Sequence, residues 1–152
     1  MKRFVFTLQA LANYKNTVER MQKAELRRAQ QALRELQDEE QRLLRAYAEN
    51  ERSLERALRE NNNVVAALSE HDAFFRFLRD ALNELRERII KAEALVRECQ
   101  ARLIVTMNEI KTYDKLRAEQ YYDYLKEVQT EEEKEMGDIV SFNTVNELTG
   151  AS

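Results

Sequence analysis

The chain has 152 residues and a formal net charge of -3, with no proline, no tryptophan and only two glycines. Charged residues of mixed sign make up 35% of it, a composition typical of long helices and coiled coils. This scarcity of turn residues argues against a multilayer globular fold, and the near-neutral charge argues against a nucleic-acid partner. No apolar run is long enough to span a membrane, and the N-terminus does not resemble a signal peptide. The single cysteine excludes an internal disulfide and fits a reducing cytoplasm.

A first helix is expected over about residues 5–61. Its apolar line begins with Leu11, Tyr14, Val18 and Met21. It weakens through Glu25 and Arg28, where Ala24, Ala29 and Ala32 offer only small side chains. The line resumes one residue out of step and runs through Leu33, Leu36, Glu40, Leu43, Tyr47, Asn50, Leu54 and Ala57. A shift of this kind indicates a stutter, which would locally unwind a supercoil.

The connection is expected within residues 61–70. Three consecutive asparagines at 61–63 compete with helix through side-chain hydrogen bonds to the backbone. Just beyond them, Ser69-Glu70-His71-Asp72 is typical of a helix N-terminus. The second helix is therefore expected over about residues 70–137, with Gly137 as its C-cap.

The second helix carries the clearest periodicity of the chain. Twelve residues follow one another at alternating spacings of three and four: Phe75, Leu78, Leu82, Leu85, Ile89, Ala92, Val96, Cys99, Leu103, Thr106, Ile110 and Tyr113. We call this line the seam of the second helix. Its average period of 3.5 predicts a left-handed supercoil with a partner helix. Because the two helices are similar in length and joined by a short connection, the simplest partner is the first helix, folded back antiparallel. The predicted fold is all-α, with two long helices forming an antiparallel coiled-coil hairpin over residues 1–140 and a flexible C-terminal tail over 141–152.

No catalytic constellation is visible, so the chain is not expected to be an enzyme. His71 is the single histidine and has no second metal ligand at a suitable spacing. Cys99 falls on the apolar line, where a buried inert thiol is expected. There is no glycine-rich phosphate loop. We expect no catalytic residue, no cofactor and no metal site.

Several apolar residues lie off the expected helix–helix contact. Phe74 and Phe77 lie beside it on the second helix, and Leu44 and Leu58 are similarly displaced on the first. They either broaden the core near the bend or form a partner-binding surface. A second cluster, Tyr121, Tyr122 and Tyr124, suits a partly hydrated interface. The acidic run at 131–135 is either a solvated face or an electrostatic docking patch.

Both ends of the sequence resemble the flagellar export protein FliJ family. The family's N-terminal F-x-F-x-L-x-x-L pattern is matched by Phe4-Val5-Phe6-Thr7-Leu8-Gln9-Ala10-Leu11. Its C-terminal region is matched by Lys111-Thr112-Tyr113-Asp114-Lys115-Leu116 followed by Glu131-Glu132-Glu133-Lys134-Glu135-Met136-Gly137-Asp138-Ile139. Gly137 departs from the pattern, where another acidic residue would be expected.

The resemblance implies a non-enzymatic hairpin similar to the stalk of a rotary ATPase, located in the cytoplasm at the membrane export apparatus. It also implies insertion into the hexameric export ATPase FliI, contact with the export gate FlhA, and a role as an escort of export chaperones. By position, the open end would enter the ring, through Phe4, Tyr121, Tyr122, Tyr124 and Met136. The surface near the bend, with Phe74 and Phe77, would face the gate. The alternative is a generic self-associating coiled-coil scaffold or adaptor.

Overall fold

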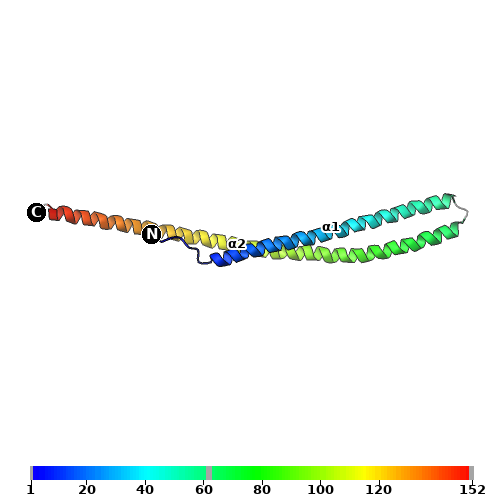
Figure 1. The fold of residues 1–152 in the computed structure, drawn as a ribbon, viewed down its shortest axis with the longest axis horizontal. Coiled ribbons are helices and arrows are strands. Elements are labelled where there is room, and N and C mark those ends of the chain that lie inside the picture. Colours follow the sequence, from blue (N-terminus) through cyan, green and yellow to red (C-terminus); the bar gives the residue numbers. More distant parts are fainter. Residues whose placement is uncertain (1, 61–62, 151–152) are drawn as a thin grey trace. The chain divides into compact units, whose positions relative to one another are not determined.

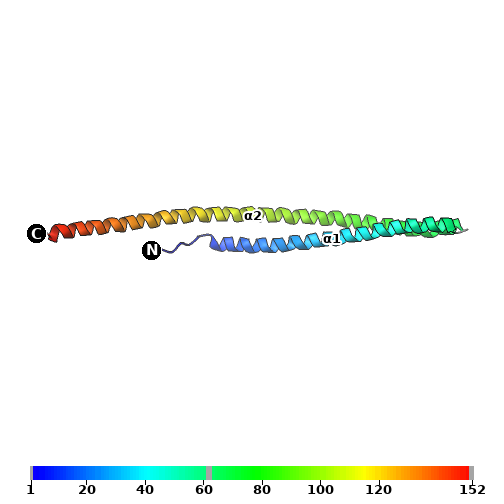
Figure 2. The same cartoon turned by 90° about the horizontal axis from the view of Figure 1, so that it is seen from above.

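The computed structural model describes residues 2–60 and 63–150, which form two helices. Helix α1 (Gln9–Glu60) and helix α2 (Val64–Gly150) pack against each other as a hairpin, which confirms the predicted fold. Figures 1 and 2 show α1 in blue to cyan and α2 in green to red. The chain divides into two compact units, one of Met1–Glu19 with Val105–Ser152 and the other of Arg20–Ile104. Each unit contains a part of both helices.

Helix α2 begins at Val64 rather than near residue 70. The side-chain Oδ1 of Asn63 accepts a hydrogen bond from the backbone N–H of Ala66 at 3.2 Å. An asparagine in this position satisfies one of the free N–H groups of the first turn, so Asn63 acts as the N-cap. The apolar residues that follow then form the first turn of α2, and Ala67 is buried there. Residues 61 and 62 of the expected connection lie outside the described part of the chain.

The predicted seam of α2 is confirmed by burial. Its buried members in the unit Arg20–Ile104 are Leu78, Leu82, Leu85, Ile89, Val96, Cys99 and Leu103. The remaining members of the line are buried or half-buried as well. In the same unit Val96 and Cys99 pack on the small side chain of Ala29, with Leu26 and Leu33 beside them. The alanines of α1 therefore supply a packing surface where the apolar line of that helix looked weak.

The seam of α1 differs from the expectation in its N-terminal half. Three of the four residues of the predicted line, Leu11, Tyr14 and Met21, are exposed, and Val18 is half-buried. One unbroken alternation of three and four runs back from Leu33 through positions that are all buried or half-buried: Ala29, Leu26, Gln22, Glu19, Lys15 and Ala12. The predicted stutter is therefore wrong, because the phase of the C-terminal half continues through polar residues.

Beyond Val128, α2 continues as an exposed helix. Every residue from 129 to 150 is exposed. The positions that would prolong the seam are occupied by Glu127, Glu131, Lys134 and Asp138, which suit water rather than a helix–helix contact. Gly137 has no positive φ and lies inside the helix, so it is not the C-cap. Residues 141–150 are helical, and the flexibility expected for the tail stays a prediction.

Candidate partner-binding surfaces

An aromatic cluster forms where the extended N-terminal segment lies on α2. The ring of Phe4 meets that of Tyr121 edge-to-face, with centroids 5.0 Å apart, and that of Tyr124 at 5.5 Å. The Tyr124 hydroxyl donates a hydrogen bond to the backbone carbonyl of Lys2 at 2.8 Å. Edge-to-face packing places the positive edge of one ring on the negative face of the other. We call Phe4, Tyr121 and Tyr124 the N-terminal aromatic cluster.

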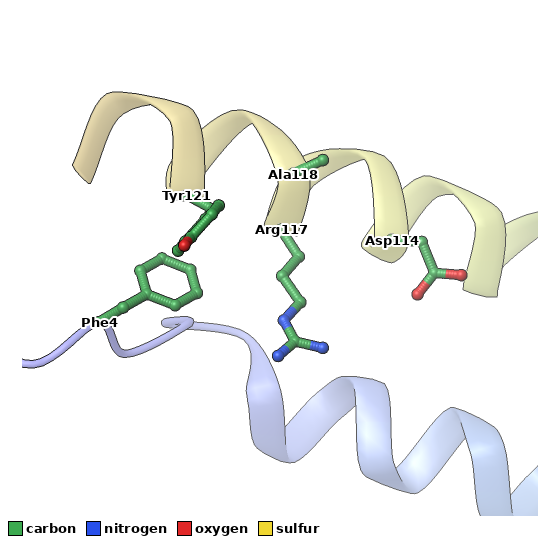
Figure 3. A pocket seen from close by; sticks show the side chains of 5 residues that line it. All are labelled: Phe4, Asp114, Arg117, Ala118 and Tyr121. Carbon is green, nitrogen blue, oxygen red and sulfur yellow. The ribbon is translucent and has the colours of Figure 1, made fainter. Parts of the chain in front are cut away.

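A shallow pocket of about 360 Å³ opens beside this cluster. It is lined by Phe4, Asp114, Arg117, Ala118 and Tyr121. Figure 3 shows Phe4 and Tyr121 pointing toward each other and Arg117 reaching from α2 toward the N-terminal segment. One carboxylate and one guanidinium on an open apolar floor can hold a complementary polar side chain. The lining contains no histidine, cysteine or serine that could serve as a nucleophile or general base.

Phe6 of the N-terminal segment is buried, and one further hydrogen bond joins this segment to α2. The side-chain amide of Gln120 donates a hydrogen bond to the hydroxyl of Thr7 at 3.2 Å. These contacts explain why the residues before α1 follow α2 instead of continuing the helix. They also fix the position of Phe4 against Tyr121.

Tyr122 and Met136 were predicted to belong with these residues, and the structure does not bring them into the cluster. Tyr122 is exposed, and the Nζ atom of Lys126 lies over its ring, 4.5 Å from the centroid. Met136 is exposed on the helical extension. Tyr121 and Tyr124 share one face of the helix because they are three residues apart, whereas Tyr122 lies on another face.

The extension of α2 carries Met136, which was predicted as a partner-binding residue, and further apolar residues that were not. Exposed large side chains there are Met136, Ile139, Val140, Phe142, Val145 and Leu148. They share the helix with the acidic run 131–135. Phe142, Val145 and Leu148 lie within residues 141–152, which were predicted to be a flexible tail.

The predicted surface near the bend is only partly exposed. Phe74 and Phe77 are both exposed, and their rings stack with centroids 6.3 Å apart. Leu58 is exposed, whereas Leu44 is half-buried. Leu44 thus broadens the core, and the other three remain on the surface. Val64, Val65 and Leu68 add exposed apolar area in the first turns of α2.

Charged groups form pairs on the surface of the hairpin. Lys15 forms an ion pair with Glu109, and this hydrogen-bonded carboxylate raises the pKa of the lysine. Arg102 pairs with Glu98 one turn away, and the hydrogen bond to Glu98 raises the pKa of the guanidinium. Arg86 lies 3.6 Å from Glu40 of α1. The two raised pKa values stabilise the charged forms of Lys15 and Arg102, which is the opposite of the neutral, reactive base that catalysis at neutral pH needs.

Within residues 2–60 and 63–150, no group of three or more histidine, cysteine or acidic side chains is arranged to hold a metal ion. Neither described helix contains a stretch long and apolar enough to cross a membrane.

A helical hairpin with exposed apolar and aromatic surfaces defines a coiled-coil protein of the kind that binds other proteins. The family model described as "Flagellar FliJ protein" matches residues 4–148, so the chain belongs to the FliJ family. This confirms the resemblance and makes the chain a non-catalytic component of flagellar export. Comparison with curated proteins and with solved structures gave no match.

Proposed function

We propose that the chain is the coiled-coil stalk of the flagellar type III export apparatus. In this role it inserts into the hexameric ring of the export ATPase FliI and links the ring to the membrane export gate FlhA. It also escorts export chaperones at the cytoplasmic face of the apparatus. The match of the FliJ family model to residues 4–148 is the observation that carries the proposal.

The ring is assigned to the end of the hairpin that contains the N-terminal aromatic cluster. Helix α2 is exposed on all sides from residue 129 to residue 150, as a segment that enters a protein-lined pore would have to be before it binds. Tyr122 and Met136 belong to the same end and are exposed. Phe4, Tyr121 and Tyr124 would act through the cluster that they form, by holding the N-terminal segment on α2.

The gate is assigned to the surface near the bend. Phe74 and Phe77 form a stacked, exposed aromatic pair there, and such pairs are enriched at protein interfaces. Leu58 adds exposed apolar area. The half-buried Leu44 would contribute less to this surface.

Paired binding assays test the assignment of the two ends. The double variant Phe74→Ala/Phe77→Ala should lose binding to the cytoplasmic domain of FlhA and keep its stimulation of FliI ATPase activity. The double variant Tyr121→Ala/Tyr124→Ala should show the opposite result. Ile90→Ala, which truncates another exposed apolar side chain, is the matched control and should affect neither assay. If Phe74→Ala/Phe77→Ala lost the stimulation of FliI ATPase activity while Tyr121→Ala/Tyr124→Ala kept it, the assignment of the two ends would be rejected.

Sedimentation in dilute solution separates the stalk from a self-associating scaffold. A hairpin that covers its own seam sediments as a monomer. A scaffold whose helices pair between chains sediments as a dimer or larger species, and this result would refute the stalk.

A further inference from the structure

The first turns of α2 carry two neighbouring apolar stripes. One is the start of the seam, Phe75 and Leu78, and the other is Phe74, Phe77 and Ala81. The second stripe ends at Ala81, because the next positions along it are Glu84 and Arg88. From Leu82 onward only the seam can face α1. Near the bend, however, a rotation of only the first turns of α2 by one residue, about 100°, taken up by a local π-bulge before Leu82, would present the other stripe to α1.

A buried polar pair lies at this point of the hairpin. Asn50 of α1 is a seam residue with only 7% of its surface exposed. Its Nδ2 donates a hydrogen bond to the backbone carbonyl of His71 on α2 at 3.2 Å. Its Oδ1 lies 2.7 Å from the Nδ1 atom of the same histidine. Both polar groups of the buried amide are therefore satisfied by one residue of the opposite helix.

The two contacts determine the proton positions. A carbonyl oxygen can only accept, so the amide nitrogen of Asn50 faces the backbone of His71 and the amide oxygen faces the ring. Nδ1 of His71 must then carry a hydrogen. Both the neutral Nδ1–H imidazole and the imidazolium meet this requirement, so the pair can form in either protonation state.

This pair is more selective than the apolar contact next to it. One turn along, the ring of Tyr47 packs on that of Phe75, with centroids 4.8 Å apart. A phenylalanine brought to the same place by rotation could pack there too, because apolar burial is not directional. Hydrogen bonds are directional, and rotation of α2 would break both of them and leave the amide of Asn50 buried without partners.

We propose that the Asn50–His71 pair selects which apolar stripe of α2 faces α1, and thereby keeps Phe74 and Phe77 on the surface. The sequence near the bend permits two rotations of the helix, and the polar pair is compatible with only one of them. This inference concerns the hairpin alone and holds whatever protein binds the exposed pair of phenylalanines.

Hydroxyl-radical footprinting with residue-level mass spectrometry tests the proposal on the native phenylalanines. In the unaltered chain, Phe74 and Phe77 should react faster than the half-buried Phe75. In Asn50→Leu, the rate at Phe75 should rise and that at Phe77 should fall, each by about twofold if the two rotations become comparably populated. His71→Leu removes the contact of Asn50 with the imidazole ring but keeps the contact with the backbone. It should shift the ratio of the Phe75 rate to the Phe77 rate in the same direction by less. Thr106→Val, which replaces the other buried polar residue of the seam, should leave the ratio unchanged.

Circular dichroism establishes that each variant is folded before its ratio is read. The native ratio in a folded Asn50→Leu chain would overturn the proposal, as would an equal shift in Thr106→Val. If Asn50→Leu does not fold, the ratio of the Phe75 rate to the Phe77 rate in His71→Leu tests the proposal instead. An unchanged ratio in that variant would overturn the proposal.

Discussion

Lys15 of α1 forms an ion pair with Glu109 of α2 although it occupies a seam position. The carboxylate replaces the apolar partner that a seam residue ordinarily has. The side chain of Lys15 remains 26% exposed, so water and salt screen the pair. The ion pair therefore makes a small contribution to stability, and the contribution depends on pH.

The pH dependence follows from the raised pKa of Lys15, whose first cause is the hydrogen bond to Glu109. A group whose pKa is raised on folding stabilises the folded state below its unfolded pKa, which is 10.5 for lysine. This contribution is lost as the pH rises through the folded-state value. Thermal unfolding between pH 8 and pH 12 should therefore show a smaller alkaline drop in Tm for Lys15→Met than for the unaltered chain.

Lys111→Met is the control for this measurement, since it removes an exposed lysine of α2. It should keep the alkaline drop of the unaltered chain. Identical pH profiles for Lys15→Met and the unaltered chain would show that the ion pair with Glu109 does not form in solution.

The buried side chains of the α2 seam should carry most of the stability of the hairpin. Leu85 is almost fully buried, and Leu85→Ala should destabilise the fold by about 2–4 kcal/mol through lost burial and the cavity left behind. Leu95 is an exposed leucine on the same helix, and Leu95→Ala should change the free energy of unfolding by no more than about 0.5 kcal/mol. Chemical denaturation followed by circular dichroism measures both. Equal losses would mean that the seam is not where the helices meet.

Gln22 should be a site where an apolar substitution stabilises the chain. Its side-chain Oε1 is buried and has no hydrogen-bond partner within the described structure. Gln22→Leu removes this unsatisfied group and places an apolar side chain on the seam, so it should stabilise the hairpin by about 1–2 kcal/mol. Gln37→Leu, at an exposed position of the same helix, should have little effect. Destabilisation by Gln22→Leu in chemical denaturation would contradict the seam phase that the structure assigns to α1.

Gln22 also shows why one half of the fold was predictable and the other was not. The seam of α2 could be predicted because twelve positions in a row agree on one phase. In the first part of α1, Leu11, Tyr14 and Met21 form an apolar line with the same spacing, one residue ahead of the polar residues that face α2. The sequence favours the apolar line. The polar line faces α2 because it continues, at the same spacing, into Leu33 and the seam residues after it. That continuity depends on pairing with α2.

The bend and the aromatic cluster follow the same principle. Asn63 and Ser69 are both good N-cap residues. The burial of Ala67 favours Asn63 as the N-cap, and this burial could not be predicted from a local sequence pattern. Hairpin topology predicts that Phe4, Tyr121 and Tyr124 lie at the same end, whereas their ring contacts depend on the path of the N-terminal segment along α2. The separation of Tyr122 from them could also have been predicted, because it follows from helical phase.

Gly137 lies inside α2 with open space around it, so alanine should fit there. A Cβ atom built on Gly137 meets nothing within 4 Å, and the residue has no positive φ. Alanine is favoured over glycine in a helix interior by about 1 kcal/mol. Gly137→Ala should therefore raise hydrogen-exchange protection of the flanking residues 131–145 about fivefold, since 1 kcal/mol corresponds to that factor.

Gly150→Ala, at the last residue of the helix, should leave the protection of residues 131–145 unchanged. The comparison distinguishes a helix that continues through Gly137 from one that ends there, as the sequence alone had suggested. If Gly137 were a C-cap, it would need the left-handed conformation that alanine disfavours. Gly137→Ala would then lower the protection of the residues before it, and the helical extension with its exposed apolar side chains would not exist in solution.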